Sequence, residues 1–301
     1  MKTAGATAAI ERSFDGDAVR RRSTARSALR LLGRRPRLAI GTFGVLALIL
    51  FAILAPSFVS RGPYAQDLTV PLHAPSWSHA FGTDALGREE LTRTIYGART
   101  SLEVASVAVI ISICVGTAIG LVSGWFGGIV DEVLMGVVEV FVSFPFILLA
   151  IVVVAFLRPS TGHTVIALAV TGWVALARII RGQVLSLKTA PFIESARTVG
   201  CSTPRLLLRH ILPQTVSSIT VIGTLEISRM MLVEGGLSFL GLGVPLPTPS
   251  WGNMLADGKS HLSDAWWLTT FPGAALLVAV LLVNQLGDGL RDIFDPTLRG
   301  R

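Results

Sequence analysis

Long apolar runs with almost no charge recur along the chain and dominate its pattern. Six of them lie at about residues 38–56, 101–124, 132–157, 163–180, 212–233 and 268–287. A helix rises about 1.5 Å per residue, so each run can cover the roughly 30 Å hydrocarbon core of a bilayer with some tilt. Lipid offers no partner for backbone polar groups, so such runs must be helical. The pattern predicts an all-α polytopic membrane protein with six transmembrane helices.

Basic residues gather in three segments that flank these runs. Ten of the 26 Lys and Arg residues precede residue 38, six lie between Arg178 and Arg209, and three lie from Arg291 onward. Cytoplasmic loops carry an excess of Lys and Arg, and six spans place both termini on one side. One orientation therefore makes both termini and the central basic segment cytoplasmic. The segments at about 58–98 and 234–267, with mixed or acidic charge, then face outward.

Composition favours lipid over water or nucleic acid as the main environment. Hydrophobic residues make up 51% of the chain and charged residues 15%, and the mean hydropathy is +0.65. A soluble domain of this length needs more charge on its surface. The net charge of +7 could suggest nucleic acid, but the basic residues flank apolar runs instead of forming a groove-sized patch. We expect membrane lipid, and no nucleic acid, as a partner.

The runs divide the chain into four segments. Residues 1–36 form a basic cytoplasmic tail that we expect to be disordered. A cleavable secretory or twin-arginine signal is the rival interpretation, but the run 38–56 is about long enough to span and no clear small-residue cleavage site follows it. Residues 37–98 hold the first transmembrane helix and an extracytoplasmic segment. Residues 99–290 form the transmembrane core with a cytoplasmic loop at 182–211, and residues 291–301 are the cytoplasmic C-terminus.

Two local patterns predict how the helices pack. Small residues recur at four-residue spacing in the second run, at Ala108, Ser112, Gly116, Gly120, Gly124 and Gly128. Small side chains let another helix approach closely, which supplies packing where lipid gives no hydrophobic drive. We favour packing within the same subunit, with a subunit interface as the alternative. Pro145 in the third run predicts a kink.

The fifth run has a polar side. Thr215, Ser218, Glu226 and Arg229 fall on one side of a helical wheel. A carboxylate and a guanidinium three residues apart can neutralise each other inside a bundle. The pair then either braces the fold or, with Ser218, lines a path for a solute. The sequence leaves both interpretations open.

The helix start and stop signals in the loop between the fourth and fifth runs predict two short helices joined by a turn. Pro191 suits a first helical turn, Gly200 suits the left-handed residue that ends a helix, and Ser202-Thr203-Pro204 resembles a new N-cap followed by proline. A helix of about nine residues is not stable alone, so we expect it to dock against another surface. An amphipathic helix lying on lipid is the alternative, but Glu194 and Gly200 suit it poorly.

Glu194-Ser195-Ala196, then Gly200 and Ile211-Leu212-Pro213, resemble the EAA…G…I-LP loop of permeases in binding-protein-dependent ATP-binding-cassette importers. In that family the loop forms coupling helices that sit in a groove of the ATPase subunit. Ser195 replaces the middle Ala of the family pattern with another small residue. The resemblance implies the fold of a type I importer transmembrane domain. It also implies a role in ATPase coupling for Glu194, Ser195, Ala196, Gly200, Ile211 and Pro213.

Motifs elsewhere extend this resemblance to the dipeptide, oligopeptide and nickel branch. They are 81–88, 96–102, 237–243 and 249–254, and the ending 287–292 with Asp295-Pro296 is similar to the C-type permease subunit. The resemblance implies a bacterial plasma-membrane permease for dipeptides or short oligopeptides, with nickel as the alternative solute. Implied partners are a second permease subunit, two ATPase subunits or domains, and an extracytoplasmic solute-binding protein.

Nothing in the residue pattern indicates catalysis or a resident cofactor. The segment 252–260 looks like a phosphate-binding loop, but five residues separate its glycines where four are required. The histidines show no metal-ligand spacing and no partnered nucleophile. We therefore expect no catalytic or metal site in this chain, with ATP and Mg used by the partner ATPase subunits. An ion-coupled secondary transporter is an alternative that Glu226 keeps open and the cytoplasmic loop disfavours.

Overall fold

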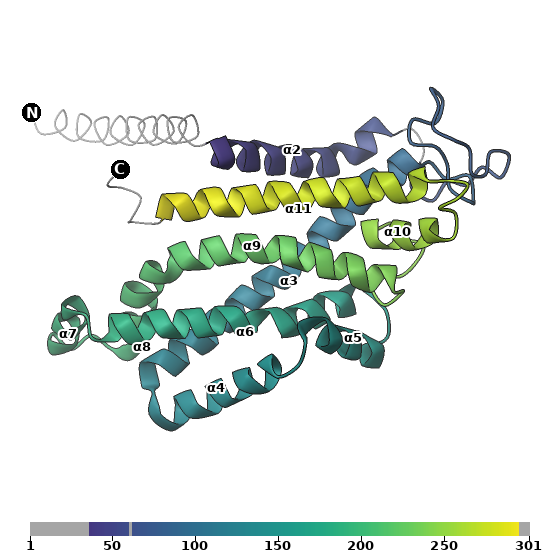
Figure 1. Ribbon diagram of the computed structural model, residues 1–301. Helices are drawn as coiled ribbons and strands as arrows, with labels where there is room; N and C mark the ends of the chain where they lie inside the picture. Colours follow the sequence, from purple (N-terminus) through teal and green to yellow (C-terminus); the bar gives the residue numbers. More distant parts are fainter. Residues whose placement is uncertain (1–35, 60–61, 295–301) are drawn as a thin grey trace, which may run out of the picture.

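The computed structural model describes residues 36–59 and 62–294, and every regular element in these ranges is a helix (Figure 1). Most of the expected basic tail, and Asp295-Pro296, lie outside the described residues. Five helical stretches are long and apolar enough to cross a membrane. They are α2 (Pro36–Phe58), α3 (Glu90–Phe126), α6 (Thr161–Lys188), α11 (Trp267–Phe294), and the continuous stretch formed by α8 (Thr203–Arg205), η1 (Leu206–Ile211) and α9 (Leu212–Phe239). The predicted all-α, polytopic architecture is confirmed.

The sixth span is broken into two helices. α4 (Gly128–Val142) and α5 (Phe146–Leu157) are bent by 90° at the residues between them. Pro145 lies in this break, with φ −56° and ψ 126°, and immediately precedes α5. Its ring fixes φ and removes the N–H that a continuing helix needs, and it disfavours helical geometry at Phe144. The kink expected at Pro145 is confirmed, as a complete break.

α3 packs along α6, and the stripe of small residues is the reason. A Cβ added at Gly120 would lie 2.7 Å from the carbonyl oxygen of Ala177, and one at Gly116 would lie 2.6 Å from that of Trp173. The two backbones approach more closely than larger side chains would permit. Packing within the subunit is therefore confirmed for this part of the stripe. Gly128 is not part of this seam, since nothing lies within 4 Å of its Cβ position.

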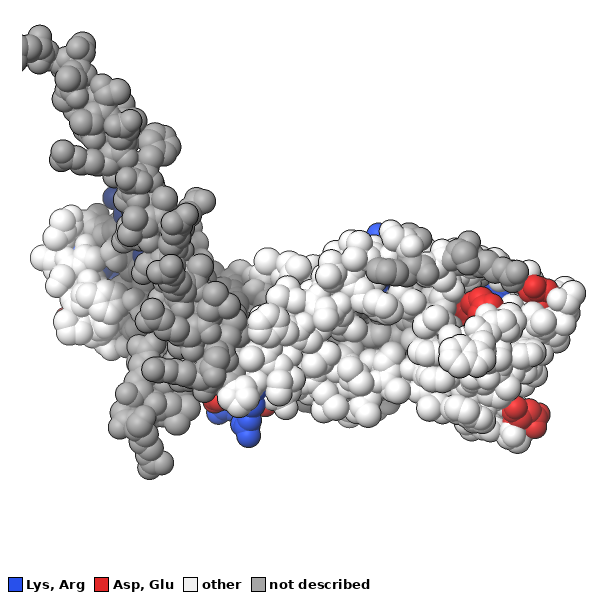
Figure 2. Space-filling view, turned by 90° about the horizontal axis from the view of Figure 1, so that it is seen from above, with Lys and Arg blue, Asp and Glu red and all other residues white. Residues whose placement is uncertain are grey.

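The two ends of the bundle differ. The start of α2, the end of α11 and the short helix α7 (Pro191–Thr198) share one end, whereas α10 (Trp251–Lys259) and the loop at 62–89 lie at the other (Figure 1). The face seen in Figure 2 has acidic side chains at the end that carries α10 and is largely uncharged along its middle. This distribution fits a protein whose middle lies in hydrocarbon. α3 begins at Glu90, so residues 90–98 belong to a spanning helix and not to the outer segment expected for them.

We predict that Gly120→Ala destabilises the folded chain, because the new methyl group must displace the backbone of α6. The cost of such overpacking is about 1–3 kcal/mol. Gly136→Ala in α4 is the matched control, since nothing lies within 4 Å of its Cβ position. Alanine is favoured over glycine inside a helix by up to about 1 kcal/mol, so this control should be neutral or slightly stabilising. Thermal stability of the detergent-solubilised protein measures both; equal stability of the two variants would contradict the seam.

Candidate functional site

α7 is a short helix held by one face. Pro191 is its first residue, and the N–H groups of Ile193 and Glu194 donate to the Ala190 carbonyl at 2.9 and 3.2 Å. Ile193 is fully buried in an apolar cluster that includes Leu121 and Trp125 of α3, Leu206 and Ile211. Phe192, Glu194 and Ser195 are exposed. The helix is thus anchored through Ile193 and presents its other face outward.

The turn after α7 has the geometry expected of a glycine that ends a helix. Gly200 has φ +82°, its N–H donates to the Arg197 carbonyl at 2.9 Å, and the Cys201 N–H donates to the Ala196 carbonyl at 3.0 Å. A left-handed residue followed by such backward hydrogen bonds is a common helix ending. Nothing lies within 4 Å of a Cβ placed on Gly200. Glycine is therefore required here by backbone conformation and not by crowding.

The second short helix expected in this loop does not stand apart. α8 begins at Thr203 after Ser202, as predicted, but it continues through the π-helical turn η1 into α9 without a break at Pro213. Proline has no N–H, so in an α-helix it would leave a carbonyl four residues back unpaired. The π turn changes the pairing locally, and the Leu212 N–H donates to the Leu207 carbonyl. Ile211 is buried beside Ile193, whereas Pro213 is exposed.

Two cations join the α7 region to the end of α3. The guanidinium carbon of Arg197 lies 4.4 Å from the centre of the Trp125 ring, and the Lys188 ammonium donates a hydrogen bond to the Trp125 carbonyl. An arginine over an aromatic ring is attracted by the ring's quadrupole. Residues so far apart in sequence give no local signal of this contact. It couples α7 mechanically to a long spanning helix.

The polar side of α9 does not form a single cavity. Glu226 and Arg229 form the predicted ion pair, with 3.2 Å between Oε1 and Nη1, but the Arg229 side chain is 44% exposed. Its guanidinium lies 4.0 Å from the centre of the Phe146 ring at the start of α5. Ser218 instead accepts a hydrogen bond from the Gln183 amide and lines a different pocket. Thr215 is buried and donates to its own helix at Leu212.

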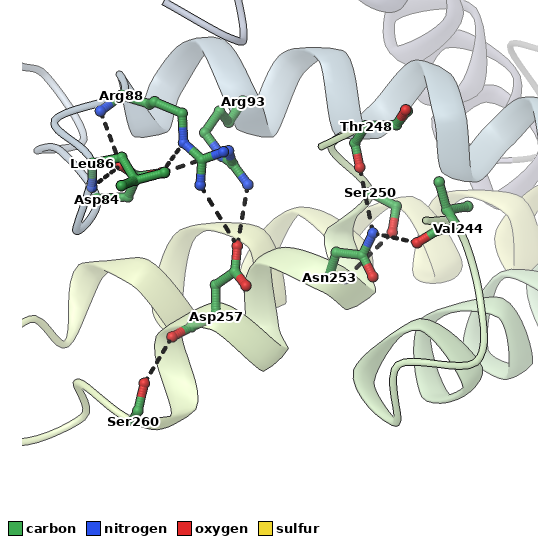
Figure 3. Close-up of polar contacts among 10 residues, drawn as sticks. All are labelled: Asp84, Leu86, Arg88, Arg93, Val244, Thr248, Ser250, Asn253, Asp257 and Ser260. Atoms are coloured by element: carbon green, nitrogen blue, oxygen red, sulfur yellow. Dashed lines mark hydrogen bonds and ion pairs between the residues drawn. The ribbon is translucent and has the colours of Figure 1, made fainter. Parts of the chain in front are cut away.

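At the opposite end of the bundle, two arginines and two carboxylates form a compact ionic network (Figure 3). Asp84 Oδ2 lies 2.5 Å from Arg88 Nε and 3.5 Å from Arg93 Nη1, and Asp257 Oδ2 lies 3.3 Å from Arg93 Nη2. The Arg93 side chain is only 1% exposed. Burial raises the pKa of Asp257, and the adjacent guanidinium groups of Arg93 and Arg88 oppose that rise. The network ties the outer loop to α3 and α10.

Hydrogen bonds from tryptophan and asparagine side chains complete this end. Trp251 Nε1 donates to the Thr94 carbonyl at 3.0 Å, and Asn253 Nδ2 donates to the Val244 carbonyl at 2.7 Å (Figure 3 for the latter). Ser250 Oγ accepts from the Asn253 N–H and begins α10. The motifs at 81–88 and 249–254 were the only sequence signal for these contacts. Their charged partners Arg93 and Asp257 lie outside both motifs and were not predicted.

We predict that Asp84→Ala lowers the stability of the protein sharply, because it leaves the buried Arg93 and Arg88 short of a carboxylate. Removing one partner of a buried ion pair typically costs about 3–5 kcal/mol. Asp264→Ala is the matched control, since Asp264 is exposed and its side chain has no ionic or hydrogen-bonding partner among the described residues. Thermal unfolding of the two variants in detergent measures the effect. A similar small shift of the unfolding temperature in both variants would show that the network adds no stability.

Comparison with known proteins identifies the family. Residues 116–300 match the family model described as the binding-protein-dependent transport system inner membrane component. The chain is 39% identical over 292 residues to the dipeptide transport system permease protein DppC of Bacillus subtilis, covering 96% of this chain and 91% of the relative. It is also 39% identical over 261 residues to the oligopeptide transport system permease protein OppC of Bacillus subtilis, covering 86% and 85%.

A third relative is a putative peptide transport system permease protein of Brucella suis, 38% identical over 270 residues that cover 90% of this chain and 91% of the relative. The match to the family model, at residues 116–300, includes α4, α5, the α7 loop and α10. The chain belongs to the family of inner membrane components of binding-protein-dependent transport systems and is a permease, not an ATP-hydrolysing enzyme.

Proposed function

We propose that this permease carries dipeptides or short oligopeptides inward across a bacterial plasma membrane, forming the path with a second permease subunit. The supporting observation is α7 with its Gly200 turn. One buried residue anchors this helix, and its exposed face includes Phe192, Glu194 and Ser195. An ATPase subunit that uses ATP and Mg receives this face in a groove. A helix of eight residues needs such a contact to hold its position.

Coupling then works through contacts that end at the spanning helices. Closure of paired ATPase subunits displaces α7, and the contacts of Ile193, Arg197 and Lys188 with the end of α3 transmit the displacement. Packed side chains of this kind move as a unit because interiors are dense. The ionic network at the far end provides a fixed frame for that motion. This end is also where an extracytoplasmic solute-binding protein delivers its cargo.

The charges near the middle of the bundle favour a peptide over nickel as the solute. Arg178 and Arg229 line one pocket beside the break between α4 and α5. Guanidinium groups repel a divalent cation and attract a carboxylate. The names of the relatives, which refer to dipeptide, oligopeptide and peptide transport, support the same choice. Glu226 is paired with Arg229, which removes the residue that kept an ion-coupled carrier in consideration.

We predict that Gly200→Val lowers solute uptake and co-purification of the ATPase together, while membrane insertion persists. A β-branched residue at φ +82° is strained, and left-handed geometry costs an ordinary residue roughly 1–2 kcal/mol. Gly200→Asn is the matched control because asparagine tolerates this conformation far better. Uptake assays and pull-down of the ATPase measure the effect. Normal uptake and association in Gly200→Val would remove α7 and its turn from the coupling role.

We predict that cysteines at the two ends react from opposite sides of the membrane. In a chain with Cys114→Ala and Cys201→Ser, Ser263→Cys should react with an impermeant thiol reagent added to intact cells, whereas Thr198→Cys should not. Both positions are exposed. Thr198→Cys should react in inverted vesicles washed free of ATPase. Labelling of Thr198→Cys in intact cells would reverse the proposed orientation, which rests on the basic segments.

A further inference from the structure

A pocket of about 310 Å³ opens where the broken span meets α6 and α9. Its lining includes Phe141, Phe144, Phe146, Thr171, Arg178 and Arg229. Pockets that bind small molecules are mostly apolar and aromatic, with a few polar groups that fix the ligand's orientation, and begin at about 300 Å³. The size and lining therefore fit a site for part of a small solute.

The pocket carries uncompensated positive charge. Arg229 is paired with Glu226, but Arg178 is exposed and forms no ion pair or hydrogen bond from its side chain to any residue that the structure describes. None of the lining residues is acidic. The lining thus holds two guanidinium groups, and the one carboxylate that pairs with either of them, Glu226, lies outside the lining. Arg178 is therefore available to pair with a negatively charged group from outside this chain.

The depth of the pocket decides what it can face. Arg178 lies ten residues before the end of α6 at the α7 end of the bundle, and Arg229 lies ten residues before the end of α9 at the opposite end, so neither is in the last turns of its helix. A charged side chain near the bilayer centre costs at least about 2.5 kcal/mol in lipid, so a charge on a spanning helix is expected to face protein or a water-filled cavity. Non-helical backbone within a membrane must likewise be buried in protein or line a water-filled cavity. Broken spans often form solute sites for this reason. The break at Pro145 lines this same pocket.

We propose that this pocket is a carboxylate site on the translocation path, where Arg178 and Arg229 hold the C-terminal carboxylate of the passing peptide. The planar guanidinium fork matches a carboxylate in two parallel hydrogen bonds. Arg178 has its donors free for this purpose, and the Phe146 ring and Glu226 hold Arg229 in place. Phe141 and Phe144 provide apolar surface for the peptide's last side chain. The assignment rests on the proposed peptide substrate.

The headgroup of an anionic lipid is the competing source of negative charge, and the experiment separates the two. The complete importer, with its binding protein, is reconstituted in vesicles of phosphatidylcholine alone or with phosphatidylglycerol. Uptake is measured for one tripeptide with a free C-terminal carboxylate and for the same tripeptide as its C-terminal carboxamide. The binding protein is identical throughout, so its own preference cancels when permease variants are compared.

Arg178→Gln should lower the ratio of acid to amide uptake about tenfold, the equivalent of one charge-assisted hydrogen bond of 1.4 kcal/mol. Arg158→Gln is the matched control, because Arg158 is also exposed and its side chain is unpaired among the described residues, but it lies at the far end of α5. That control should keep the wild-type ratio. If the binding protein rejects the amide, uptake of the acid per ATP hydrolysed is compared instead. A loss is expected in Arg178→Gln and not in the control Arg158→Gln.

The double variant Glu226→Gln/Arg229→Gln removes both charges of the ion pair, so neither partner is left alone. It should also lower the ratio of acid to amide uptake. An unchanged ratio, or unchanged acid uptake per ATP, in both Arg178→Gln and the double variant would overturn the carboxylate site. An effect of Arg178→Gln confined to vesicles with phosphatidylglycerol would assign the pocket to a lipid headgroup and overturn it as well. Absence of peptide uptake by the wild-type complex would instead refute the proposed substrate class.

Discussion

The exclusion of water from the hydrocarbon core is the constraint on which the rest of this structure depends. Backbone groups there must pair within the chain, so the spanning segments are helices, and charges collect at the two ends of the bundle. Three departures from this rule lie close together. The broken span at Pro145, the Glu226–Arg229 pair and the unpaired Arg178 all meet around a single pocket. These features cost energy in lipid, and we propose that they are retained because a polar solute passes there.

The two ends of the bundle are built for different mechanical roles. At the α10 end, buried arginines and carboxylates, together with side-chain bonds from Trp251 and Asn253, fix the outer loop and α10 against α3. At the α7 end, a short helix rests on one buried side chain, Ile193, and on a cation stacked over Trp125. The first arrangement resists displacement. In the proposed coupling, the second arrangement permits displacement of α7 and transmits it to α3, which packs closely against α6.

Several features of the candidate sites were predictable because their causes are local. The left-handed conformation at Gly200 and the start of α7 at Pro191 follow from backbone sterics within a few residues. The pairing of Glu226 with Arg229 follows from their spacing on one helix. The prediction of a separate second short helix was wrong, because a π turn re-pairs the backbone ahead of Pro213 and joins α8 to α9, with Leu206 and Ile211 held by packing.

The sequence by itself determined the helical, membrane-spanning class and the family, because apolar run length and loop motifs depend on neighbouring residues alone. Tertiary structure decided which charges act together. Arg93 meets Asp257, Arg197 meets Trp125, and Arg178 shares a pocket with Arg229, although each pair is widely separated along the chain. Contacts between such distant residues depend on how the helices cross and on how deep each side chain lies in the bundle. Hydrophobic periodicity specifies neither, because it records only which face of a helix is apolar.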